Sequence, residues 1–224
     1  MKAVILYLNE EKPFSEYSRL LPFISEERRS RIERMAVNGD KIRSLFAELL
    51  IRYEASEQLG ADFNKLVFEK NSFGKPFAVG NDGYDFSVSH SAGAVAFAGG
   101  FSAAGADIER IRRRKNSVSE RFFAENEINF IEKSDDPDEA FFEIWTKKEA
   151  YSKMLGKGLA AGFNSFDVTS GELCCGFYTV IKHGYAFSVC SDRPSEVTKL
   201  LKITELTEDE FLQKLSECLN FTFY

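Results

Sequence analysis

Short apolar runs and apolar-polar alternation predict a series of strands along the chain. The opening run over residues 3–8 is continuously apolar, which is typical of a buried strand. Over residues 84–89 the pattern alternates, with apolar side chains on one face and Ser87 and Ser89 on the other. The expected strands lie at about residues 3–8, 66–69, 84–89, 94–101, 105–109, 165–169, 176–181, 185–189 and 197–203.

Helical periodicity is clearest over about residues 40–59 and 138–155. In the second of these segments, apolar residues recur at spacings of 3, 7 and 4, so they form one stripe that ends at Gly156. Further helices are expected at about residues 25–34, 118–123 and 125–131, and a closing helix begins at the capping box Thr207 to Glu210. Each half of the chain therefore offers strands with helices, which indicates an α+β fold.

The division of the chain is placed from position alone, because no periodic repeat or low-complexity linker appears. The boundary is expected near Ala103 to Gly105, which gives lobes of residues 1–103 and 104–224. A chain of 224 residues with 44% hydrophobic residues and 22 Phe can bury one large core or two smaller ones.

Composition narrows the function classes. The formal net charge of -6 argues against general nucleic-acid binding, although a local basic patch could hold a small polyanion. The opening apolar run is too short for a signal peptide or a membrane span. Cys174 and Cys175 are adjacent while Cys190 and Cys218 stand apart, so the spacing of a zinc site is missing. We expect a cytoplasmic protein with reduced cysteines and no zinc.

The stretch from Trp145 to Leu159 carries the first candidate chemistry. At ~100° per residue, Glu149 and Lys153 project within ~40° of each other and away from the apolar stripe. They form either a surface ion pair without a chemical role or a pair that acts on one ligand. Lys148 falls inside the apolar stripe, where a cation must reach the surface or meet an anion.

Two carboxylates share a direction on the expected strand at 105–109. Asp107 and Glu109 are two residues apart and so lie on one face of that strand. With Glu149 from the helix, they would supply the oxygen ligands that Mg²⁺ prefers while leaving positions for phosphate. The alternative is a pair of solvent-facing acids on an edge strand. Likewise, His90 alone is typical of a hydrogen-bonded turn histidine.

Several motifs in this order resemble one enzyme family. The motifs are FSVSHS at 86–91, GADIE at 105–109, FFAENE at 122–127, WTKKEAYSK at 145–153 and GKGL at 156–159, with GKP at 74–76. Together they resemble the 4'-phosphopantetheinyl transferases, in particular the large single-chain class typified by the enzymes that activate surfactin synthetase. The resemblance spans most of the chain and weakens after about Phe166.

The resemblance implies both an activity and an architecture. The expected reaction transfers the 4'-phosphopantetheine arm from coenzyme A to a serine hydroxyl of an apo acyl or peptidyl carrier protein, with release of adenosine 3',5'-bisphosphate. The expected fold is a monomer of two similar lobes, each a small, mainly antiparallel sheet with helices packed on it. The active site would lie in the cleft between the lobes, and neither nucleic acid nor membrane is an expected partner.

The resemblance also implies roles for individual residues. The positions that match its Mg²⁺ ligands are Asp107, Glu109 and Glu149, and Lys153 matches the lysine that contacts the pyrophosphate. The positions that match contacts to the 3'-phosphate end of coenzyme A are Arg28, Arg31, Arg43 and His90, with Ser89 adjacent and Lys75 near the adenine. Two departures are an extra cation at Lys147 and the basic run from Arg112 to Lys115.

The carrier serine needs a general base, and two acids are candidates. Glu149 is the first, acting directly or through water, and Glu127 is the second because its context also matches the family. The alternative for Glu127 is a helix-surface acid. His90 and Lys153 would add positive charge around the pyrophosphate, and Lys148 is expected near the cleft. Rival functions for the same residues are a Mg²⁺-dependent phosphodiester or pyrophosphate hydrolase and a non-catalytic coenzyme A-binding protein.

Overall fold

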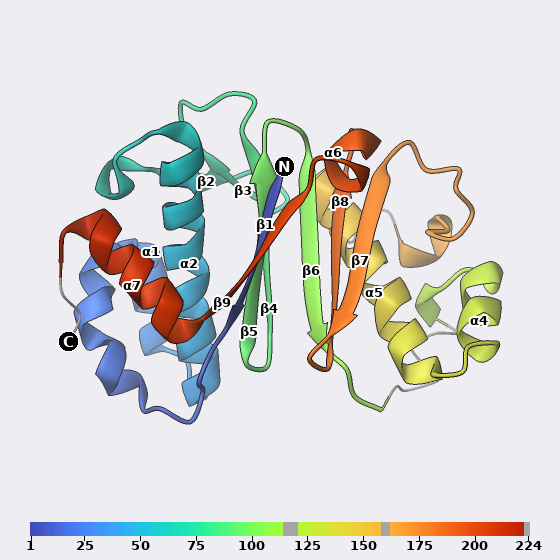
Figure 1. The fold of residues 1–224 in the computed structure, drawn as a ribbon, viewed down its shortest axis with the longest axis horizontal. Coiled ribbons are helices and arrows are strands. Elements are labelled where there is room, and N and C mark those ends of the chain that lie inside the picture. The colour runs from blue at the N-terminus through green and yellow to red at the C-terminus, as the bar shows by residue number, and fades with distance from the viewer. Residues whose placement is uncertain (114–120, 158–161, 222–224) are drawn as a thin grey trace.

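The computed structural model describes residues 1–113, 121–157 and 162–221, and these residues form two larger sheets side by side, with helices on their outer faces, and a small two-stranded sheet (Figure 1). The strands are β1 (Lys2–Tyr7), β2 (Phe68–Lys70), β3 (Pro76–Ala78), β4 (Asp85–Ser91), β5 (Ala94–Gly100), β6 (Ala104–Arg110), β7 (Gly176–Lys182), β8 (Tyr185–Ser191) and β9 (Lys202–Thr207). The helices are α1 (Glu26–Glu33), α2 (Asn38–Leu59), α4 (Glu125–Glu132), α5 (Pro137–Leu155), α6 (Pro194–Thr198) and α7 (Glu208–Leu219). Short 3-10 helices are η1 (Phe14–Phe23), η2 (Phe63–Lys65) and η4 (Phe163–Ser165).

Antiparallel pairing dominates both sheets. The first sheet has the order β4-β5-β1-β9, in which only the β1–β9 pair is parallel. The second sheet has the order β6-β8-β7 and is antiparallel throughout. β2 and β3 form the small antiparallel sheet, and β3 packs against β4. We call the first sheet, the β2–β3 pair, α1, α2 and α7 the first lobe, and the second sheet with α4, α5 and α6 the second lobe. The predicted α+β class with small, mainly antiparallel sheets is confirmed.

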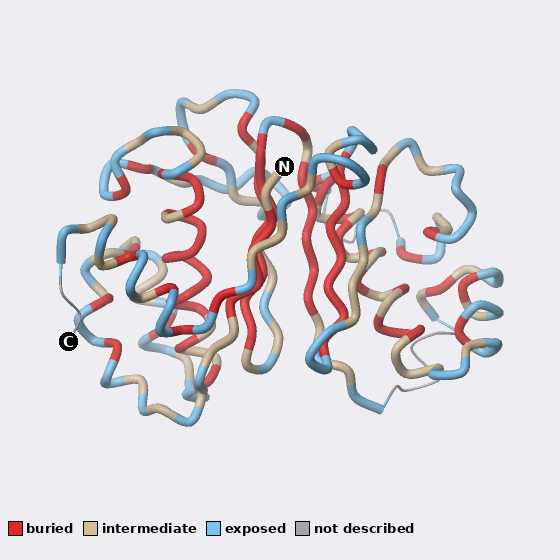
Figure 2. Tube along the Cα trace, in the orientation of Figure 1, coloured by how far each residue is buried: buried red, intermediate tan, exposed pale blue. Residues whose placement is uncertain are grey.

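Each lobe has its own apolar core, and a third cluster joins them. In the first lobe α2 is buried along most of its length (Figure 2), and Phe46 packs there with Phe97 and Phe211. The second lobe is centred on aromatic residues of α5, including Phe141. Between the two sheets, alanines of β1, β5 and β6 are buried together with larger side chains such as Phe187. Small side chains let the two sheets lie close together.

The far end of the chain returns to the first lobe. β9 pairs with β1, and Phe211 and Leu215 of α7 belong to the first core. These elements were expected in the second lobe, so that assignment is wrong for residues 202–219. The capping box that begins the last helix was predicted correctly, since Thr207 Oγ1 accepts a hydrogen bond from the backbone N–H of Glu210.

Three local expectations differ from the structure. Residues 165–169 form no strand but a 3-10 turn followed by bends. The strand expected at 197–203 begins at Lys202 and is preceded by α6, which starts at Pro194. His90 and Ser91 lie within β4 rather than between two strands. The helix expected at 118–123 falls largely outside the described residues. No helix in the described part of the chain is long and apolar enough to cross a membrane.

Candidate active site

A glycine brings helix α5 against strand β6. A Cβ atom added at Gly105 would lie 1.8 Å from the carbonyl oxygen of Ala150 and 2.6 Å from the backbone nitrogen of Met154. Any larger residue would therefore push the helix away from the strand. This contact places Glu149 and Lys153 of α5 beside the two acids of β6. The close packing explains why the GADIE motif has glycine at position 105.

Serines of β4 connect the two sheets. β4 and β6 are edge strands of different sheets, and they pack side by side without pairing through a backbone ladder. Ser89 Oγ donates to Asp107 Oδ1 at 2.6 Å, and Ser91 Oγ donates to Glu109 Oε2 at 2.9 Å. Ser87 adds a weaker bond to the carbonyl of Ala106 at 3.4 Å. The predicted alternation in β4 is therefore confirmed, and its serine face joins the lobes.

Lys153 completes a three-residue network across the cleft. Its Nζ donates to Asp107 Oδ1 at 2.6 Å and to Ser89 Oγ at 2.9 Å. The Lys153 side chain keeps 29% of its surface exposed, whereas Asp107 keeps 5%. The ammonium thus remains accessible while the acid is nearly covered. The alternative that Glu149 and Lys153 form a simple surface ion pair is therefore wrong, because Lys153 bonds Asp107 instead.

Burial and nearby negative charge raise the pKa of two of the three predicted metal-ligand acids, Glu149 and Glu109. Burial raises the pKa of Glu149 to about 7, and the negative charges of Asp107 and Glu109 add to this while Lys153 opposes it. Burial and the charge of Asp107 likewise raise the pKa of Glu109. The negative charge of Asp107 therefore acts on both Glu149 and Glu109, which is the effect expected of carboxylates that lie close together.

The acids fit a hard divalent cation. Oδ2 of Asp107 is buried and has no hydrogen-bond partner among the described residues, although buried carboxylate oxygens normally have one. Carboxylates at this density suit Mg²⁺, whose charge would relieve their repulsion. No three Asp, Glu, His or Cys side chains in the described ranges are already drawn to the spacing of a metal site. Instead, the Lys153 ammonium bonds Asp107.

His90 lies among cations. Its pKa is lowered, first by partial removal from water and then by the positive charges of Arg43, Lys153 and Arg28. The side chain nevertheless remains exposed at the surface. Arg43 itself forms ion pairs with Glu10 and Asp40. Of the residues predicted to hold the 3'-phosphate, Arg28 and Arg43 therefore act electrostatically on His90.

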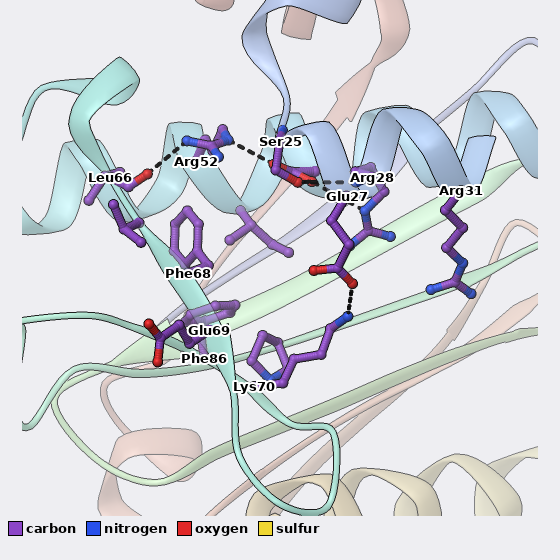
Figure 3. Close-up of a pocket in the computed structure, with 14 residues that line it drawn as sticks. Ser25, Glu27, Arg28, Arg31, Arg52, Leu66, Phe68, Glu69, Lys70 and Phe86 are labelled. Carbon is purple, nitrogen blue, oxygen red and sulfur yellow. Dashed lines mark hydrogen bonds and ion pairs between the residues drawn. The ribbon is translucent and has the colours of Figure 1, made fainter. Parts of the chain in front are cut away.

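A pocket of about 500 Å³ opens beside this cationic group, between α1, α2 and β2. Figure 3 shows Arg28 and Arg31 extending from α1 toward it, with an ion pair between Lys70 and Glu27 at its rim. Phe68 and Phe86 line its apolar side. The combination of apolar floor and arginine rim suits a flat ring that carries phosphate.

Glu48 holds two of the three arginines that line this pocket, Arg28 and Arg52, and it was not among the predicted site residues. Its carboxylate accepts from Arg28 Nε at 3.2 Å and from Arg52 Nε at 3.0 Å, and it also accepts from the backbone N–H and hydroxyl of Ser25. Arg52 is buried and donates further to the carbonyl of Leu66 at 3.0 Å. The sequence did contain a signal for Glu48, because it is an acid within the apolar stretch of the helix predicted over residues 40–59.

A second pocket, of about 290 Å³, lies in the cleft itself. Glu149 and Lys153 form one wall, and the loop with Phe73 and Lys75 forms another. Lys75 was predicted near the adenine, but its ammonium bonds Asp85 Oδ2 at 2.5 Å and faces the end of α5. The loop belongs to the cleft, while the lysine head group is already engaged.

Glu127 and Lys148 lie in the interior of the second lobe. Lys148 Nζ is 2.8 Å from Glu127 Oε2, and neither side chain is exposed. The backbone N–H groups of Ala124 and Val168 donate to the two oxygens of Glu127. Lys148 is therefore in the core with an anion, and its expected place near the cleft is wrong. The surface alternative for Glu127 is wrong as well, and its position leaves neither oxygen free.

The two departures from the family pattern have ordinary partners. Lys147 Nζ bonds Glu143 Oε1 at 2.6 Å on the same helix. The Arg112 guanidinium lies over the ring of Phe142 and 3.7 Å from Glu109 Oε2. Positions 114 and 115 of the basic run lie outside the described residues.

The predicted site residues lie within the part of the chain that matches known protein families. Residues 103–192 match the model of the 4'-phosphopantetheinyl transferase superfamily, and residues 12–102 match that of the N-terminal region of a 4'-phosphopantetheinyl transferase. The 4'-phosphopantetheinyl transferase ffp of Bacillus subtilis is 30% identical over 87% of this chain and 93% of its own. The enzyme gsp of Aneurinibacillus migulanus is 34% identical over 84% and 83%, and Sfp of Bacillus subtilis (strain 168) is 28% identical over 88% and 96%.

Proposed function

The chain belongs to the 4'-phosphopantetheinyl transferase superfamily, and we propose that it uses the cleft between its lobes to act on coenzyme A and an apo carrier protein. The family transfers the 4'-phosphopantetheine moiety from coenzyme A to carrier proteins. The observation that carries the assignment to this cleft is the hydrogen-bond network in which Ser89 of the first lobe bonds both Lys153 and Asp107 of the second lobe.

We place the phosphates of coenzyme A along the cationic side of the cleft. Arg28, Arg31, Arg43 and His90 would take the 3'-phosphate end, and Lys153 with Ser89 would take the pyrophosphate. Guanidinium groups bind phosphate with paired hydrogen bonds, and Arg28 and Arg31 point to one pocket. A bound phosphate would also favour the protonated form of His90, whose pKa is lowered by burial and by the surrounding cations.

Asp107, Glu109 and Glu149 would hold Mg²⁺. The unpartnered oxygen of Asp107 and the raised pKa values of the other two acids support this assignment. When bound, the cation would neutralise pyrophosphate charge and favour departure of the nucleotide. The chain's own contribution is to present the three carboxylates on β6 and α5 at a fixed separation, which the close contact at Gly105 sets.

Glu149 is our candidate for the general base. Its carboxylate lines the cleft pocket beside Lys153, where a carrier serine would come within hydrogen-bond reach. The carrier serine would lose its proton to Glu149 as its oxygen bonds the β-phosphorus. The bond from that phosphorus to the bridging oxygen would break, and adenosine 3',5'-bisphosphate would leave with the electron pair. Lys153 would stabilise the charge on the departing phosphate.

Glu127 has a different role in this proposal. Its oxygens are occupied by Lys148 and two backbone N–H groups inside the core, so a carrier serine cannot reach them. We assign Glu127 to holding α4, α5 and the segment around Val168 together.

The remaining parts of the proposal concern the oligomeric state, the cellular location and the partners of the protein. We propose that the protein works as a monomer in the cytoplasm, with carrier protein and coenzyme A as its partners and without nucleic acid or membrane. Its four cysteines are free, which suits a reducing compartment.

Intact-mass analysis tests the reaction. A panel of apo acyl, peptidyl and other carrier proteins is incubated with the chain, coenzyme A and Mg²⁺. We expect at least one carrier to gain one phosphopantetheine, and its serine-to-alanine variant to gain nothing. A reaction without carrier serves as the control: fast release of adenosine 3',5'-bisphosphate there, with every carrier unmodified, would refute the transferase proposal and favour hydrolysis.

A further inference from the structure

The C-terminal end of helix α5 is capped by side chains from the first lobe. The last carbonyls of a helix have no partner within it and need donors from elsewhere. Asn71 Nδ2 donates to the carbonyl of Gly156 at 3.0 Å, and Lys75 Nζ donates to the carbonyl of Met154 at 3.4 Å. Both residues belong to the turn between β2 and β3, whereas α5 belongs to the second lobe. The cap therefore crosses the cleft.

Lys75 is held at a meeting point of several elements. Besides the carbonyl of Met154, its ammonium bonds Asp85 Oδ2 at 2.5 Å and the carbonyl of Ala104 at 3.1 Å. An ammonium group has three donors, so these three acceptors match its full capacity. Asp85 also accepts from the backbone N–H of Ala104 at 2.8 Å. The lysine thus ties the β2–β3 turn to the first residues of β4 and β6 and to the end of α5.

Asn71 has two tasks that a substitution can separate. Its Oδ1 accepts from the backbone N–H groups of Phe73 and Lys75, which shapes the turn. Its Nδ2 alone reaches Gly156. The fit is close, because a Cβ at Gly156 would lie 3.1 Å from Cδ of Lys75 and 3.3 Å from Nδ2 of Asn71. Gly156 also has a φ of +63°, which glycine adopts at low cost.

The cap lies next to the residues that would carry the chemistry. Lys153 immediately precedes the capped Met154, and Glu149 lies one turn earlier on the same helix. The capping turn and these two side chains line the same cleft pocket. A shift of the turn would therefore move the pocket wall and the catalytic helix together.

We propose that Asn71 and Lys75, the α5 cap, are positioning residues that fix Glu149 and Lys153 relative to the coenzyme A pocket. The inference rests on the proposed function and gives Lys75 a role other than direct contact with the nucleotide. A small misplacement of reacting groups is costly in rate even where binding is kept. The α5 cap should accordingly act on kcat more than on KM.

Two variants test the cap, each with a matched control. Asn71→Asp keeps Oδ1 for the turn but replaces the donor to Gly156 with a carboxylate oxygen at the negative end of α5. Asn81→Asp is its control, because Asn81 Nδ2 donates to the carbonyl of Val79 within its own loop. Lys75→Met removes the three-way contact, and Lys65→Met is its control, since the Lys65 side chain is 84% exposed.

The kinetic readout is the split between kcat and KM. We expect both cap variants to lower kcat per folded molecule about tenfold, because a shift of less than about 1 Å in the reacting groups is costly in rate, with KM for coenzyme A changed less than about twofold. The controls should match the unsubstituted chain, and Lys75→Arg should recover part of the rate. If Lys75→Met instead raised KM for coenzyme A at constant kcat while Asn71→Asp had no effect, the cap proposal would be wrong.

A second readout does not depend on activity. Hydrogen exchange of the amides in the last turn of α5 should be faster in both cap variants than in the two controls. Unchanged exchange would overturn the proposal whatever the rates show. If no carrier is modified by the unsubstituted chain, the proposed function fails and exchange still decides the cap. If Lys75→Met does not fold, Asn71→Asp, which keeps the ion pair with Asp85, carries the test.

Discussion

Lys148 and Glu127 form an ion pair at 2.8 Å in which neither side chain is exposed to solvent. The lysine comes from α5 and the acid from α4, and the ammonium also donates to the carbonyls of Phe163 and Phe166 at 2.6 Å each. Burial lowers the pKa of Lys148, while the acid beside it opposes that change. The pair therefore joins three segments of the second lobe at one charged point in an apolar core.

Glu127→Gln should reduce stability rather than catalysis. The substitution leaves a buried ammonium without its anion, which typically costs about 3 to 5 kcal/mol. We expect the free energy of unfolding to fall by about that amount, and kcat per folded molecule to stay near that of the unsubstituted chain. Denaturant unfolding and transfer kinetics at low temperature measure the two effects. A variant of normal stability with a strongly reduced kcat would return Glu127 to the mechanism.

A double variant checks that the loss comes from the uncompensated charge. Lys148→Met combined with Glu127→Gln removes both charges at similar volume, so we expect it to be more stable than Glu127→Gln alone. Lys148→Met alone completes the comparison. If the loss of stability in the double variant equalled the sum of the losses in the two single variants, the two residues would not be coupled and the structural role of the ion pair would be refuted.

The predicted and observed positions of Lys148 and Glu127 show which features can be predicted from the sequence. The apolar stripe of α5 correctly exposed Lys148 as an anomaly, because periodicity reports which face a residue occupies. It could not identify the partner, because Glu127 lies on another helix and its partnership depends on tertiary packing. For the same reason, Glu48 was missed although it organises Arg28 and Arg52.

The alternation of side chains along a strand correctly predicted features that depend only on nearby residues in the sequence. The shared face of Asp107 and Glu109 and the serine face of β4 follow from a period of two, and the structure shows both. The return of β9 to pair with β1 did not follow, because the register links residues about 200 positions apart along the chain. A parallel pairing at that distance leaves no mark in the local pattern.

Asp107→Ala should abolish most transfer while coenzyme A still binds. Asp107 is the acceptor for Lys153 and Ser89 and the proposed metal ligand with a free oxygen, whereas the arginines and His90 are untouched. We expect kcat/KM to fall at least about 100-fold, as for loss of a preorganised charge contact. Calorimetric titration should show coenzyme A binding within about tenfold of normal. Normal turnover of Asp107→Ala, Glu109→Ala and Glu149→Gln in limiting Mg²⁺ would refute the metal site.

Glu149→Gln should stabilise the metal-free protein at neutral pH. The folded protein holds the Glu149 proton more tightly than the unfolded chain does, because burial and two neighbouring acids raise its pKa to about 7. Stability from this group is therefore present at acidic pH and lost as pH rises through about 7. The amide never ionises, so we expect the variant to gain roughly 1 to 2 kcal/mol at pH 8 and little at pH 5.

The matching measurement is urea unfolding at both pH values with a chelator present. Added Mg²⁺ should reverse the order at pH 8, because the cation stabilises a carboxylate and not an amide. A difference between variant and unsubstituted chain that did not change with pH would show that repulsion among the three acids is absent.

Arg28→Gln should weaken recognition of the 3'-phosphate specifically. The Arg28 guanidinium lines the larger pocket and is oriented by Glu48, and its positive charge also acts on His90. A charged hydrogen bond to phosphate is worth about 1.5 to 3 kcal/mol, so KM for coenzyme A should rise about tenfold or more with kcat nearly unchanged.

Coenzyme A lacking the 3'-phosphate gives the decisive comparison. If Arg28 binds that phosphate, the unsubstituted chain should use the dephosphorylated donor with a raised KM, and Arg28→Gln should raise it little further, because the contact is already missing. Arg29→Gln is the control on the same helix, since Arg29 faces the carbonyl of Leu21 at 3.1 Å and Glu26 rather than the pocket. An equal loss with both donors would mean that Arg28 acts by holding α1 against Glu48, and the phosphate contact would then have to be assigned to Arg31, Arg43 or His90.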